Sequence, residues 1–475
     1  MERIKTGLTF SDVLLIPKRT KLNSRSEANL QTKFTKNITL NCPLVSSNMI
    51  SVTEHKMAIA LAREGGIGVI HQFNKIEEQV AEVKKVKRGT SYIVENPIVS
   101  NENLSIKEAK DVMDKEGVTS LLITNNEELI GIFTHRDYLF ETNLEKKIFE
   151  IMTPKEKLIT ANHPITMEEA KQILHINKIE KLPLLKDGKL SGLITTQDIK
   201  KIEHWPNSAR DKKGRLLVAA AVGVKDTIER SEKLIEAGAD VIVLDIAHAH
   251  SNLAIQRLKE FKSKFDTDIL VGNIATAEAA KDLIEAGADG LKVGIGPSPV
   301  CTTRIISGSG IPQLTAIIDV CSVAKEYGIP VAADGGMKYP GDATKALGAG
   351  ASTIYSGSFF SGTDEAPGYI IMKEGKRYKR YFGSASYTSN HERKERIDNI
   401  KLKEKIDVFV EGVANLVDYK GPVDDVIKSL LKGIRSGISY CGAQNLEEMR
   451  NNAEFIKITS NGWTESLSRG KRMSE

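Results

Sequence analysis

Short apolar runs alternate with amphipathic helical segments along the C-terminal half of the chain. From about residue 215 onward, stretches of mostly Val, Ile, Leu and Ala are separated by segments whose apolar residues recur at helical spacing. Many of the runs end in Gly, Asp or Asn, and this alternation of strand and helix predicts a parallel α/β fold. The runs are LLVAAAV, DVIVLDIA, DILVGNIA, GLKVGIG, PVAADGG and STIYSGS.

The N-terminal part adds two further strand patterns, CPLVSSNM and GGIGVIH. About eight strand–helix units, divided by an insertion, predict a (β/α)8 TIM barrel. A doubly wound sheet is the alternative, but no GxGxxG follows the first strand. The polar segments fall at the C-terminal ends of the expected strands, which form the catalytic face of a barrel.

The insertion contains an internal repeat. SIKEAK (105–110) recurs as TMEEAK (166–171), and ELIGIFTHRD (128–137) recurs at the same offset as KLSGLITTQD (189–198). Each copy predicts a short helix and then two strands joined by a polar turn, followed by an Asp that can act as a helix N-cap. Two copies are too few for a solenoid and predict a compact pseudo-symmetric pair.

This pair resembles tandem CBS (Bateman) domains, an α+β module that often binds adenine or guanine nucleotides. The resemblance implies that Asp137 and Asp198 contact a ribose, whereas the alternative is that they only cap helices. The expected organisation has barrel segments at 1–93 and 204–475. The CBS module lies between them at 94–203, with its copies at about 94–150 and 151–203.

Charge and targeting signals narrow the classes of function. The chain has 67 basic and 62 acidic residues, a formal net charge of +5, spread without the basic stripe of a nucleic-acid groove. No apolar segment suits a signal peptide or a membrane span. Four cysteines lie far apart without CxxC pairs, which indicates a reducing, cytoplasmic setting rather than a disulfide or zinc framework.

Two consecutive loops predict a phosphate site. ADGGMKYPGD (333–342) and YSGSFFSG (355–362) each place Gly and Ser after a strand and before a helix, where backbone amides can bind a phosphate. Ser358 can add a hydroxyl, and Asp334 is placed to accept from a ribose diol. The alternative is that the glycines only form tight turns.

Cys301 stands in the polar loop GIGPSPVCTTR (294–304), at a predicted strand end. It is either a core thiol or a nucleophile, since nearby Arg304 and exposed amides would favour a thiolate. The other cysteines indicate core or helix positions, Cys441 being ambiguous.

Nearly the whole chain resembles the IMP dehydrogenase/GMP reductase family. The matching stretches, specific in combination and order, are GLTFSDVLLIP, REGGIGVIH, GVTSLLI with the rest of the CBS insert, GRLLVAAAVG, GIGP followed by VCTTR, GIPQLTA, ADGG and GTDEAPG. The resemblance implies that Cys301 attacks C2 of a purine mononucleotide while hydride moves to or from NAD(H) or NADP(H). Thr303 and Glu365 would handle protons.

The resemblance also implies binding roles. Asp334 would hold the ribose, and the 5′-phosphate would lie against Gly336, Gly357, Ser358 and Tyr381. Ser47 and Met49 would line the nucleotide site, and Asp245 and Asn273 the nicotinamide site. Carbonyls of Gly294, Gly296 and Cys301 resemble a potassium site. The family implies homotetramers, and octamers through the CBS module.

The two branches of the family differ in one step. A dehydrogenase activates water with an Arg-Tyr pair on a mobile flap, expected here at about 387–420, whereas a reductase expels ammonia and needs no such pair. No Arg-Tyr dipeptide occurs in 387–409. Asn48 and Ala385 also favour GMP reductase, whereas VTEHKMAIA, LDIAHAHS and DYKGP resemble dehydrogenases. GMP reductase is therefore the leading interpretation and IMP dehydrogenase the alternative.

One departure concerns both branches. Ser298-Pro299 replaces the family's usual Gly-Ser, and proline cannot donate a hydrogen bond to phosphate, so Ser298 would have to substitute. The cation site depends on the same loop. A third hypothesis is a weakly catalytic nucleotide sensor, against which Cys301, Thr303 and Glu365 all argue.

Overall fold

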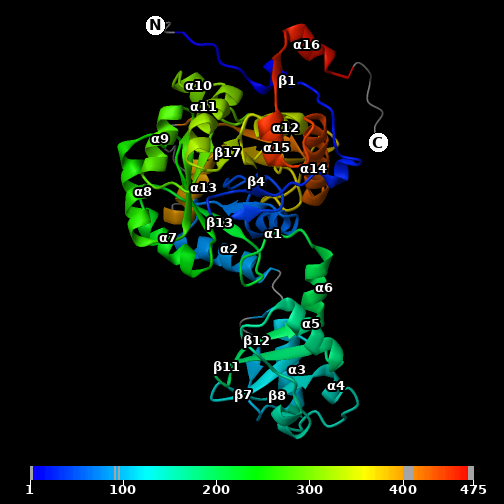
Figure 1. Ribbon diagram of the computed structural model, residues 1–475. Coiled ribbons are helices and arrows are strands. Elements are labelled where there is room, and N and C mark those ends of the chain that lie inside the picture. Colours follow the sequence, from blue (N-terminus) through cyan, green and yellow to red (C-terminus); the bar gives the residue numbers. More distant parts are fainter. Residues whose placement is uncertain (1–3, 90–92, 95–96, 399–409, 469–475) are drawn as a thin grey trace. The chain divides into compact units, whose positions relative to one another are not determined.

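The computed structural model describes residues 4–89, 93–94, 97–398 and 410–468, which divide into two compact units (Figure 1). The first contains the described residues up to Gly89, Asn207–Asp211 and those from Leu216 onward. The second contains the described residues between 90 and Pro206, together with Lys212–Arg215. The expected subdivision of the second unit at about residue 150 stays a prediction.

The first unit is a closed barrel of parallel strands, in the order β13-β14-β15-β16-β17-β18-β4-β5. The predicted TIM barrel is confirmed, and the doubly wound alternative is wrong because the sheet closes on itself. The strands are β4 (Leu44–Ser46), β5 (Ile67–Ile70), β13 (Val218–Val222), β14 (Val241–Asp245), β15 (Asp268–Ile274), β16 (Gly290–Val293), β17 (Val331–Asp334) and β18 (Thr353–Ser356).

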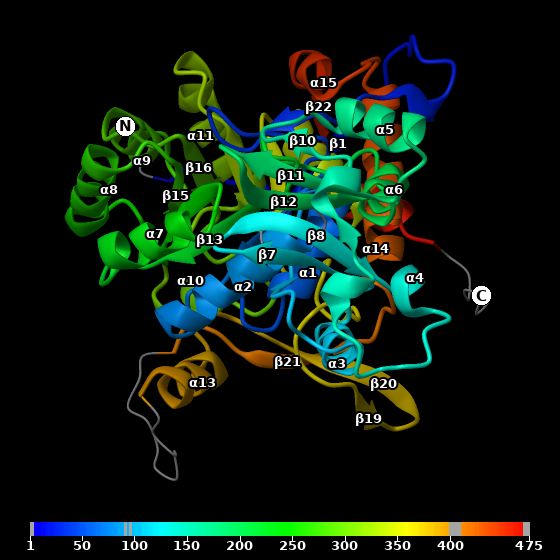
Figure 2. The ribbon, with the colours of Figure 1, turned by 90° about the horizontal axis from the view of Figure 1, so that it is seen from below.

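Helices surround the barrel strands (Figures 1 and 2). They are α1 (His55–Arg63), α2 (Ile76–Arg88), α7 (Thr227–Glu236), α8 (Asn252–Lys264), α9 (Ala277–Glu285), α11 (Gln313–Glu326), α12 (Pro340–Gly348) and α14 (Val423–Tyr440). Short additions are η1 (Phe10–Asp12), β1 (Val13–Leu15), η2 (Arg25–Glu27), β2 (Thr32–Lys33), β3 (Thr39–Leu40), α10 (Thr303–Ile306), α15 (Leu446–Asn452), β22 (Phe455–Lys457) and α16 (Ser460–Glu465).

Alternate residues of each barrel strand face two separate cores. In β13, Ala219 and Ala221 join the cluster inside the barrel, while Val218, Ala220 and Val222 join the layer beneath the helices. Both faces of a strand in such a barrel are buried, so the strands are continuous apolar runs rather than alternating ones. This explains why the hydrophobic pattern alone revealed them.

A small antiparallel sheet extends from the barrel's polar loops. It consists of β19 (Ile371–Lys373), β20 (Lys376–Phe382) and β21 (Ala414–Asp418), and Figure 2 shows it beside α13 (Tyr387–Asp398). The expected flap of about 387–420 therefore contains α13 and β21, and its residues 399–409 lie outside the described residues.

The second unit is an α+β sheet with strand order β10-β11-β12-β8-β7-β6, to which β9 adds by pairing with β8. Its two hairpins, β7–β8 and β11–β12, turn at left-handed residues, including Asn126 and Asp187. The elements are β6 (Val99–Ser100), α3 (Ile106–Glu116), β7 (Ser120–Asn125), β8 (Glu128–Thr134), α4 (His135–Tyr138), η3 (Ile148–Glu150), β9 (Thr153–Pro154), η4 (Lys155–Lys157), β10 (Ala161–Asn162), α5 (Met167–Ile176), β11 (Lys181–Lys186), β12 (Lys189–Thr195) and α6 (Thr196–His204).

The two repeated aspartates of this unit do not act as N-caps. Thr134 caps α4, and Asp137 Oδ2 accepts from the Thr134 amide at 2.6 Å and from its hydroxyl at 2.8 Å. Thr195 likewise donates to Asp198 at 2.6 Å and accepts from its amide. The cap expectation is corrected: the hydroxyl takes that position because it can both donate and accept, and the aspartate completes a capping box.

Within the described ranges, no helix combines the length and the apolar character required to cross a membrane.

Candidate active site

A cavity of about 300 Å³ opens at the C-terminal ends of the barrel strands. Loops that follow β4, β14, β15, β16, β17 and β18 all contribute to its wall, so residues from distant parts of the chain meet there. Most of the sequence-predicted site residues line it: Ser47, Met49, Asp245, Asn273, Gly294, Gly296, Cys301, Thr303, Asp334, Gly357, Ser358 and Tyr381. Gly336 and Glu365 do not.

Cys301 forms a short chain of polar contacts with two other side chains. Its Sγ lies 3.2 Å from the Thr303 hydroxyl, which donates to Glu411 Oε2 at 2.8 Å. All three residues line the cavity. The arrangement places the thiol beside a hydroxyl that can relay a proton to or from a carboxylate.

Backbone hydrogen bonds hold Glu411 at this place. Its carbonyl accepts from the Thr302 amide at 2.9 Å, and its amide donates to the Ala385 carbonyl at 3.1 Å. The next residues continue the contact, since the Val413 amide donates to the Val300 carbonyl at 3.0 Å. The segment after residue 409 is thus joined to the cysteine loop on both sides of Cys301.

Glu365 lies elsewhere. Its Oε2 accepts from the Val423 amide at 2.8 Å, at the first residue of α14. The structure corrects the expected pairing of Glu365 with Thr303, because the carboxylate at Thr303 belongs to Glu411. A carboxylate beside free helix amides is stabilised there, which accounts for the position of Glu365.

A buried lysine crosses the floor of the cavity. Lys292, in β16, is 2% exposed, and its Nζ contacts Asp245 Oδ1 and lies 3.5 Å from Asp334 Oδ2. The same ammonium lies 4.7 Å from the centre of the buried Tyr355 ring. One cation therefore neutralises two carboxylates, at the ends of β14 and β17, that would otherwise repel each other.

Two asparagines complete this network. Asn48 donates to Asp245 Oδ2 at 2.7 Å. Asn273 donates from Nδ2 to Asp334 Oδ2 at 2.8 Å and to the Gly294 carbonyl at 2.7 Å. Since both hydrogens of Asn273 are used within the protein, its Oδ1 is left as an acceptor on the cavity wall.

Burial and pairing act against each other on these groups. Burial raises the pKa of Asp334, and the Lys292 ammonium and Asn273 only partly offset this. Burial alone would lower the pKa of Lys292, but the carboxylates of Asp245 and Asp334 outweigh it and raise that pKa. Lys292 is therefore a cation in the site.

Lys292→Met is expected to destabilise the barrel strongly, because it leaves two buried carboxylates without their cation. Removing one partner of a buried ion pair costs roughly 3–5 kcal/mol. Thermal unfolding measures this, and Lys281→Met, an exposed lysine on α9, is the matched control. Adding Asp334→Asn to Lys292→Met should recover part of the loss; no recovery would contradict this electrostatic cause.

The end of the cavity where phosphate binding is expected is crowded around Gly357. A Cβ there would lie 2.8 Å from both Met49 Sδ and Tyr381 Oη, so a larger residue would require these two side chains to shift. Tyr381 is buried, which raises the pKa of its hydroxyl, and it forms a hydrogen bond with the Ser298 side chain. Ser298 therefore faces the site, consistent with the expected substitution for the donor that Pro299 lacks.

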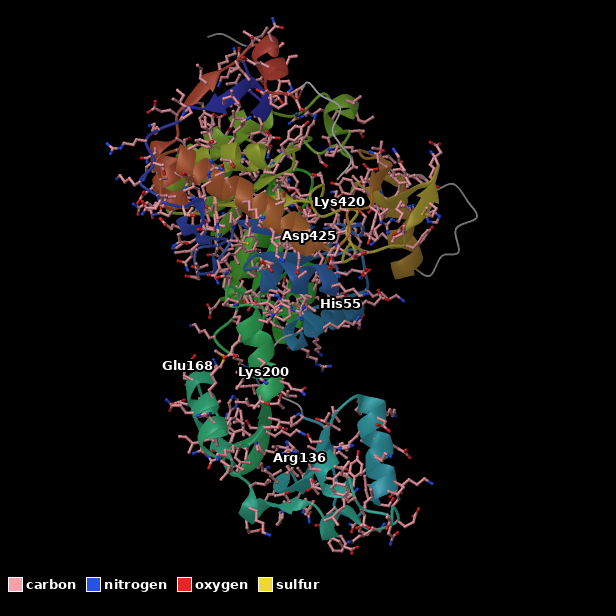
Figure 3. All side chains as sticks on the ribbon, turned by 90° about the vertical axis from the view of Figure 1, so that its right-hand side faces the viewer. His55, Arg136, Glu168, Lys200, Lys420 and Asp425 are labelled. Atoms are coloured by element: carbon pink, nitrogen blue, oxygen red, sulfur yellow. The ribbon has the colours of Figure 1, made fainter. Side chains whose placement is uncertain are left out.

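Gly336 lines an adjoining cavity of about 790 Å³, which shares Pro297, Pro299 and Ser358 with the first. Lys420 also lines it, and its ammonium donates to the carbonyls of Ser358 at 2.7 Å and Phe359 at 3.0 Å. Figure 3 labels Lys420 and, near it, Asp425, another lining residue. Partial burial of the ammonium lowers the pKa of Lys420 to about 8.

This pKa predicts a pH effect on substrate binding. Lys420 carries its charge below about pH 8 and loses it as the pH rises through that value. Loss of this charge weakens the hydrogen bonds from Lys420 to the Ser358 and Phe359 carbonyls. It also weakens the attraction of the site for a phosphate. KM for a substrate whose phosphate binds at the expected loops should rise roughly 3- to 10-fold across this range with little change in kcat. Lys420→Met should have a high KM that no longer varies with pH near 8. A KM in the variant that still rises with pH as it does in the unaltered protein would contradict this assignment.

The expected potassium ligands are partly engaged. The Gly294 carbonyl accepts from Asn273, and Arg304 donates to the neighbouring Ile295 carbonyl at 3.0 Å. The potassium site stays a prediction. The nicotinamide expectation fits the residues better, since the Asn273 oxygen can accept from a carboxamide and Asp245 reaches the same cavity.

Sequence reasoning missed three polar side chains that line the two cavities, Glu411, Lys292 and Lys420. Lysine within the apolar run GLKVGIG was the available signal for Lys292, because a buried charge requires a partner. Glu411 and Lys420 had no signal of this kind, since both lie beyond α13 in a polar segment.

Comparison with known proteins gives a consistent assignment of the domain. Residues 7–469 match the family described as IMP dehydrogenase / GMP reductase domain. An inosine-5′-monophosphate dehydrogenase of Nitrosopumilus maritimus is 49% identical over 97% of this chain and 98% of its own. One from Aquifex aeolicus is 46% identical over 98% and 96%.

Solved structures add a second set of relatives. A cysteine-to-alanine variant of GMP reductase from Trypanosoma brucei, in complex with guanosine 5′-monophosphate, has a TM-score of 0.91 and 41% identity, covering 99% of each chain. GMP reductase of the same organism, in complex with guanosine 5′-triphosphate, has a TM-score of 0.79 and 38% identity, covering 96% of this chain and 99% of its own.

Proposed function

The chain belongs to the IMP dehydrogenase/GMP reductase family of purine-nucleotide oxidoreductases, and within it we propose that the protein is a GMP reductase. The proposed reaction converts GMP, NADPH and a proton to IMP, ammonia and NADP+. The observation that carries the proposal is the Cys301–Thr303–Glu411 chain beside a segment, 387–409, whose sequence has no Arg-Tyr pair. The site has a proton relay for a leaving amine and lacks the family's usual means of activating water.

In the proposed mechanism, Cys301 Sγ attacks C2 of the bound purine and a C–S bond forms. Glu411 delivers a proton through the Thr303 hydroxyl to the 2-amino group, which leaves as ammonia when its C–N bond breaks. A reduced nicotinamide held beside Asp245 and Asn273 would supply the hydride for C2. The C–S bond then breaks and returns the thiolate, leaving IMP.

The remaining residues bind and orient the substrate. Asp334 accepts from the ribose hydroxyls, while Ser358, Gly336 and the Ser298–Tyr381 pair surround the phosphate. Asp245 and Asn273 would hold the nicotinamide riboside. NADPH rather than NADH, a potassium requirement and a homotetramer or octamer remain parts of this proposal.

IMP dehydrogenase is the second candidate, favoured by the names of relatives at 44–49% identity. It would convert IMP, NAD+ and water to XMP, NADH and a proton. Water would then need a base other than an Arg-Tyr pair, and Glu411 through Thr303 is the group positioned for that role.

Absorbance of the reduced nicotinamide separates the candidates. GMP with NADPH should lose absorbance, and IMP with NAD+ should gain little or none. Rapid NADH formation from IMP would contradict the reductase proposal. Binding of purine nucleotides without turnover in either direction would support the nucleotide-sensor hypothesis instead.

For the second unit, we propose a tandem CBS module that binds adenine or guanine nucleotides at Asp137 and Asp198. The complex of the Trypanosoma brucei GMP reductase with guanosine 5′-triphosphate supports this class of ligand. Both aspartates lie at the starts of short helices after β8 and β12, in equivalent places of the two copies.

A further inference from the structure

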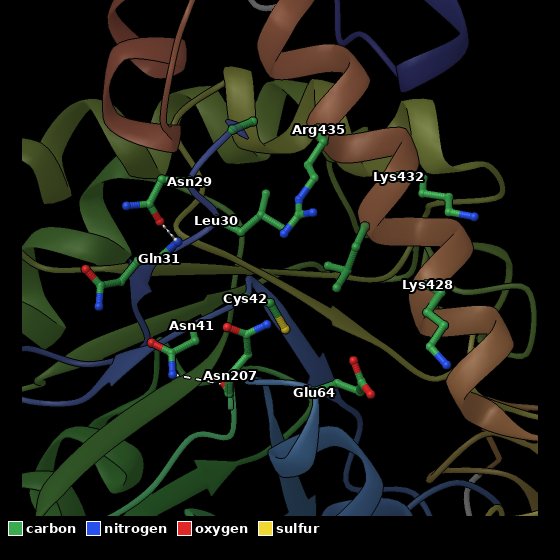
Figure 4. A pocket seen from close by; sticks show the side chains of 12 residues that line it. Asn29, Leu30, Gln31, Asn41, Cys42, Glu64, Asn207, Lys428, Lys432 and Arg435 are labelled. Atoms are coloured by element: carbon green, nitrogen blue, oxygen red, sulfur yellow. Dashed lines mark hydrogen bonds between the residues drawn. The ribbon is translucent and has the colours of Figure 1, made fainter. Parts of the chain in front are cut away.

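A separate polar cavity of about 400 Å³ lies at the opposite end of the barrel from Cys301 (Figure 4). Asn41 and Cys42 come just before β4, and Glu64 comes shortly before β5. The cavity therefore opens at the N-terminal ends of parallel strands whose C-terminal ends carry the active site. One wall is α14 (Val423–Tyr440).

The α14 wall carries three cations and no anion in the cavity. Lys428, Lys432 and Arg435 are spaced by four and three residues, which places them on one side of a helix. No ion pair joins any of them to another described residue. Figure 4 shows Arg435 reaching from the helix toward Leu30, and Lys428 extending on the side of Glu64.

Arg435 carries an unmet hydrogen-bonding demand. Its Nε is buried and has no partner among the described residues. A buried donor without a partner costs about 1–3 kcal/mol, and a guanidinium has four further hydrogens directed in a planar fork. An acceptor group in the cavity would satisfy this donor, and a tetrahedral oxyanion matches the fork.

Neutral donors surround the cations. The side chains of Asn29, Gln31 and Asn207 line the cavity. Asn29 Oδ1 accepts from the Gln31 backbone amide at 2.8 Å, which leaves the side-chain NH2 group of Asn29 available to donate. The one carboxylate, Glu64, is outnumbered by the cations, and burial raises its pKa, with nearby Asp424 acting in the same direction.

We propose that this cavity binds a polyphosphate anion, with Arg435 and Lys428 as its principal contacts. The volume accommodates a pyrophosphate group, and three cationic side chains against one carboxylate favour an anion over a cation or an apolar ligand. The anion is either inorganic pyrophosphate or the phosphate chain of a nucleotide. The site is independent of the catalytic cavity, with which it shares no residue.

Titration of the full chain with inorganic pyrophosphate, followed by calorimetry, tests the proposal. Saturable binding is expected. The single variants Lys428→Ala and Arg435→Lys should each weaken it by roughly 10-fold or more. Lys259→Ala, an exposed lysine on α8, should bind like the unaltered protein. Arg435→Lys keeps the charge and removes the fork, so folding is preserved; circular dichroism checks this for both variants.

Titrations with ATP, GTP and sulfate then decide whether the bound anion is a nucleotide or inorganic pyrophosphate, and whether binding is specific. Tighter binding of ATP or GTP than of pyrophosphate, lost in the same variants, would identify a nucleotide as the ligand. Equal binding would identify the phosphate chain alone. Binding that persists in the variants, or a sulfate solution of equal ionic strength that reproduces it, would overturn the proposal. So would the absence of binding to the unaltered protein.

Discussion

Cys301→Ala is expected to abolish turnover, by about 10⁴-fold or more, while GMP still binds. The sulfur is the atom that forms the bond to C2, and no other described residue of the cavity offers a nucleophilic thiol. The substitution removes one partner of the Thr303 hydroxyl but leaves its bond to Glu411. Steady-state rates and GMP titration on the same preparation measure both effects.

Cys321→Ala is the matched control. Cys321 is buried in α11, and burial raises the pKa of its thiol to about 12, so it is inert as a nucleophile. This variant should keep normal rates even where it unfolds at a lower temperature. Comparable activity in Cys301→Ala and the unaltered protein would contradict covalent catalysis at Cys301.

Glu411→Gln is expected to lower kcat by roughly 10²- to 10⁴-fold with little change in KM for GMP. The amide can still hold the Thr303 hydroxyl but cannot exchange a proton through it. Glu365→Gln should retain most of the activity, since an amide oxygen can still accept from the Val423 amide at the start of α14. Steady-state kinetics of the two variants, measured side by side, distinguish the two carboxylates.

The reverse result, with Glu365→Gln inactive and Glu411→Gln active, would restore the pairing expected from family resemblance.

The barrel could be predicted because its strands are buried on both faces. Runs such as DVIVLDIA have no polar side, and the polar residues directly after them mark the strand ends where the cavity forms. In a parallel barrel the C-terminal ends of all the strands lie on one face, even when the strands are far apart in the chain. Ser47 and Tyr381, which are far apart in the chain, were assigned to one site by the family resemblance rather than by this rule, and both line the cavity.

The failures concern contacts that depend on where a loop returns. Glu365 follows the last barrel strand in a recognisable motif, yet it faces α14. Glu411 reaches Thr303 only because residues 411–413 hydrogen-bond to the cysteine loop, a pairing between segments more than 100 residues apart. Lys292 was overlooked because apolar periodicity does not show which carboxylates a buried lysine will pair with, here Asp245 and Asp334.

Product analysis of GMP turnover tests the central claim most directly. Enzyme incubated with GMP and NADPH should release ammonia and IMP in amounts equal to the NADPH consumed. Cys301→Ala should release neither. A preparation that forms no ammonia from GMP, yet converts IMP, NAD+ and water to XMP and NADH, would contradict the assignment as a GMP reductase.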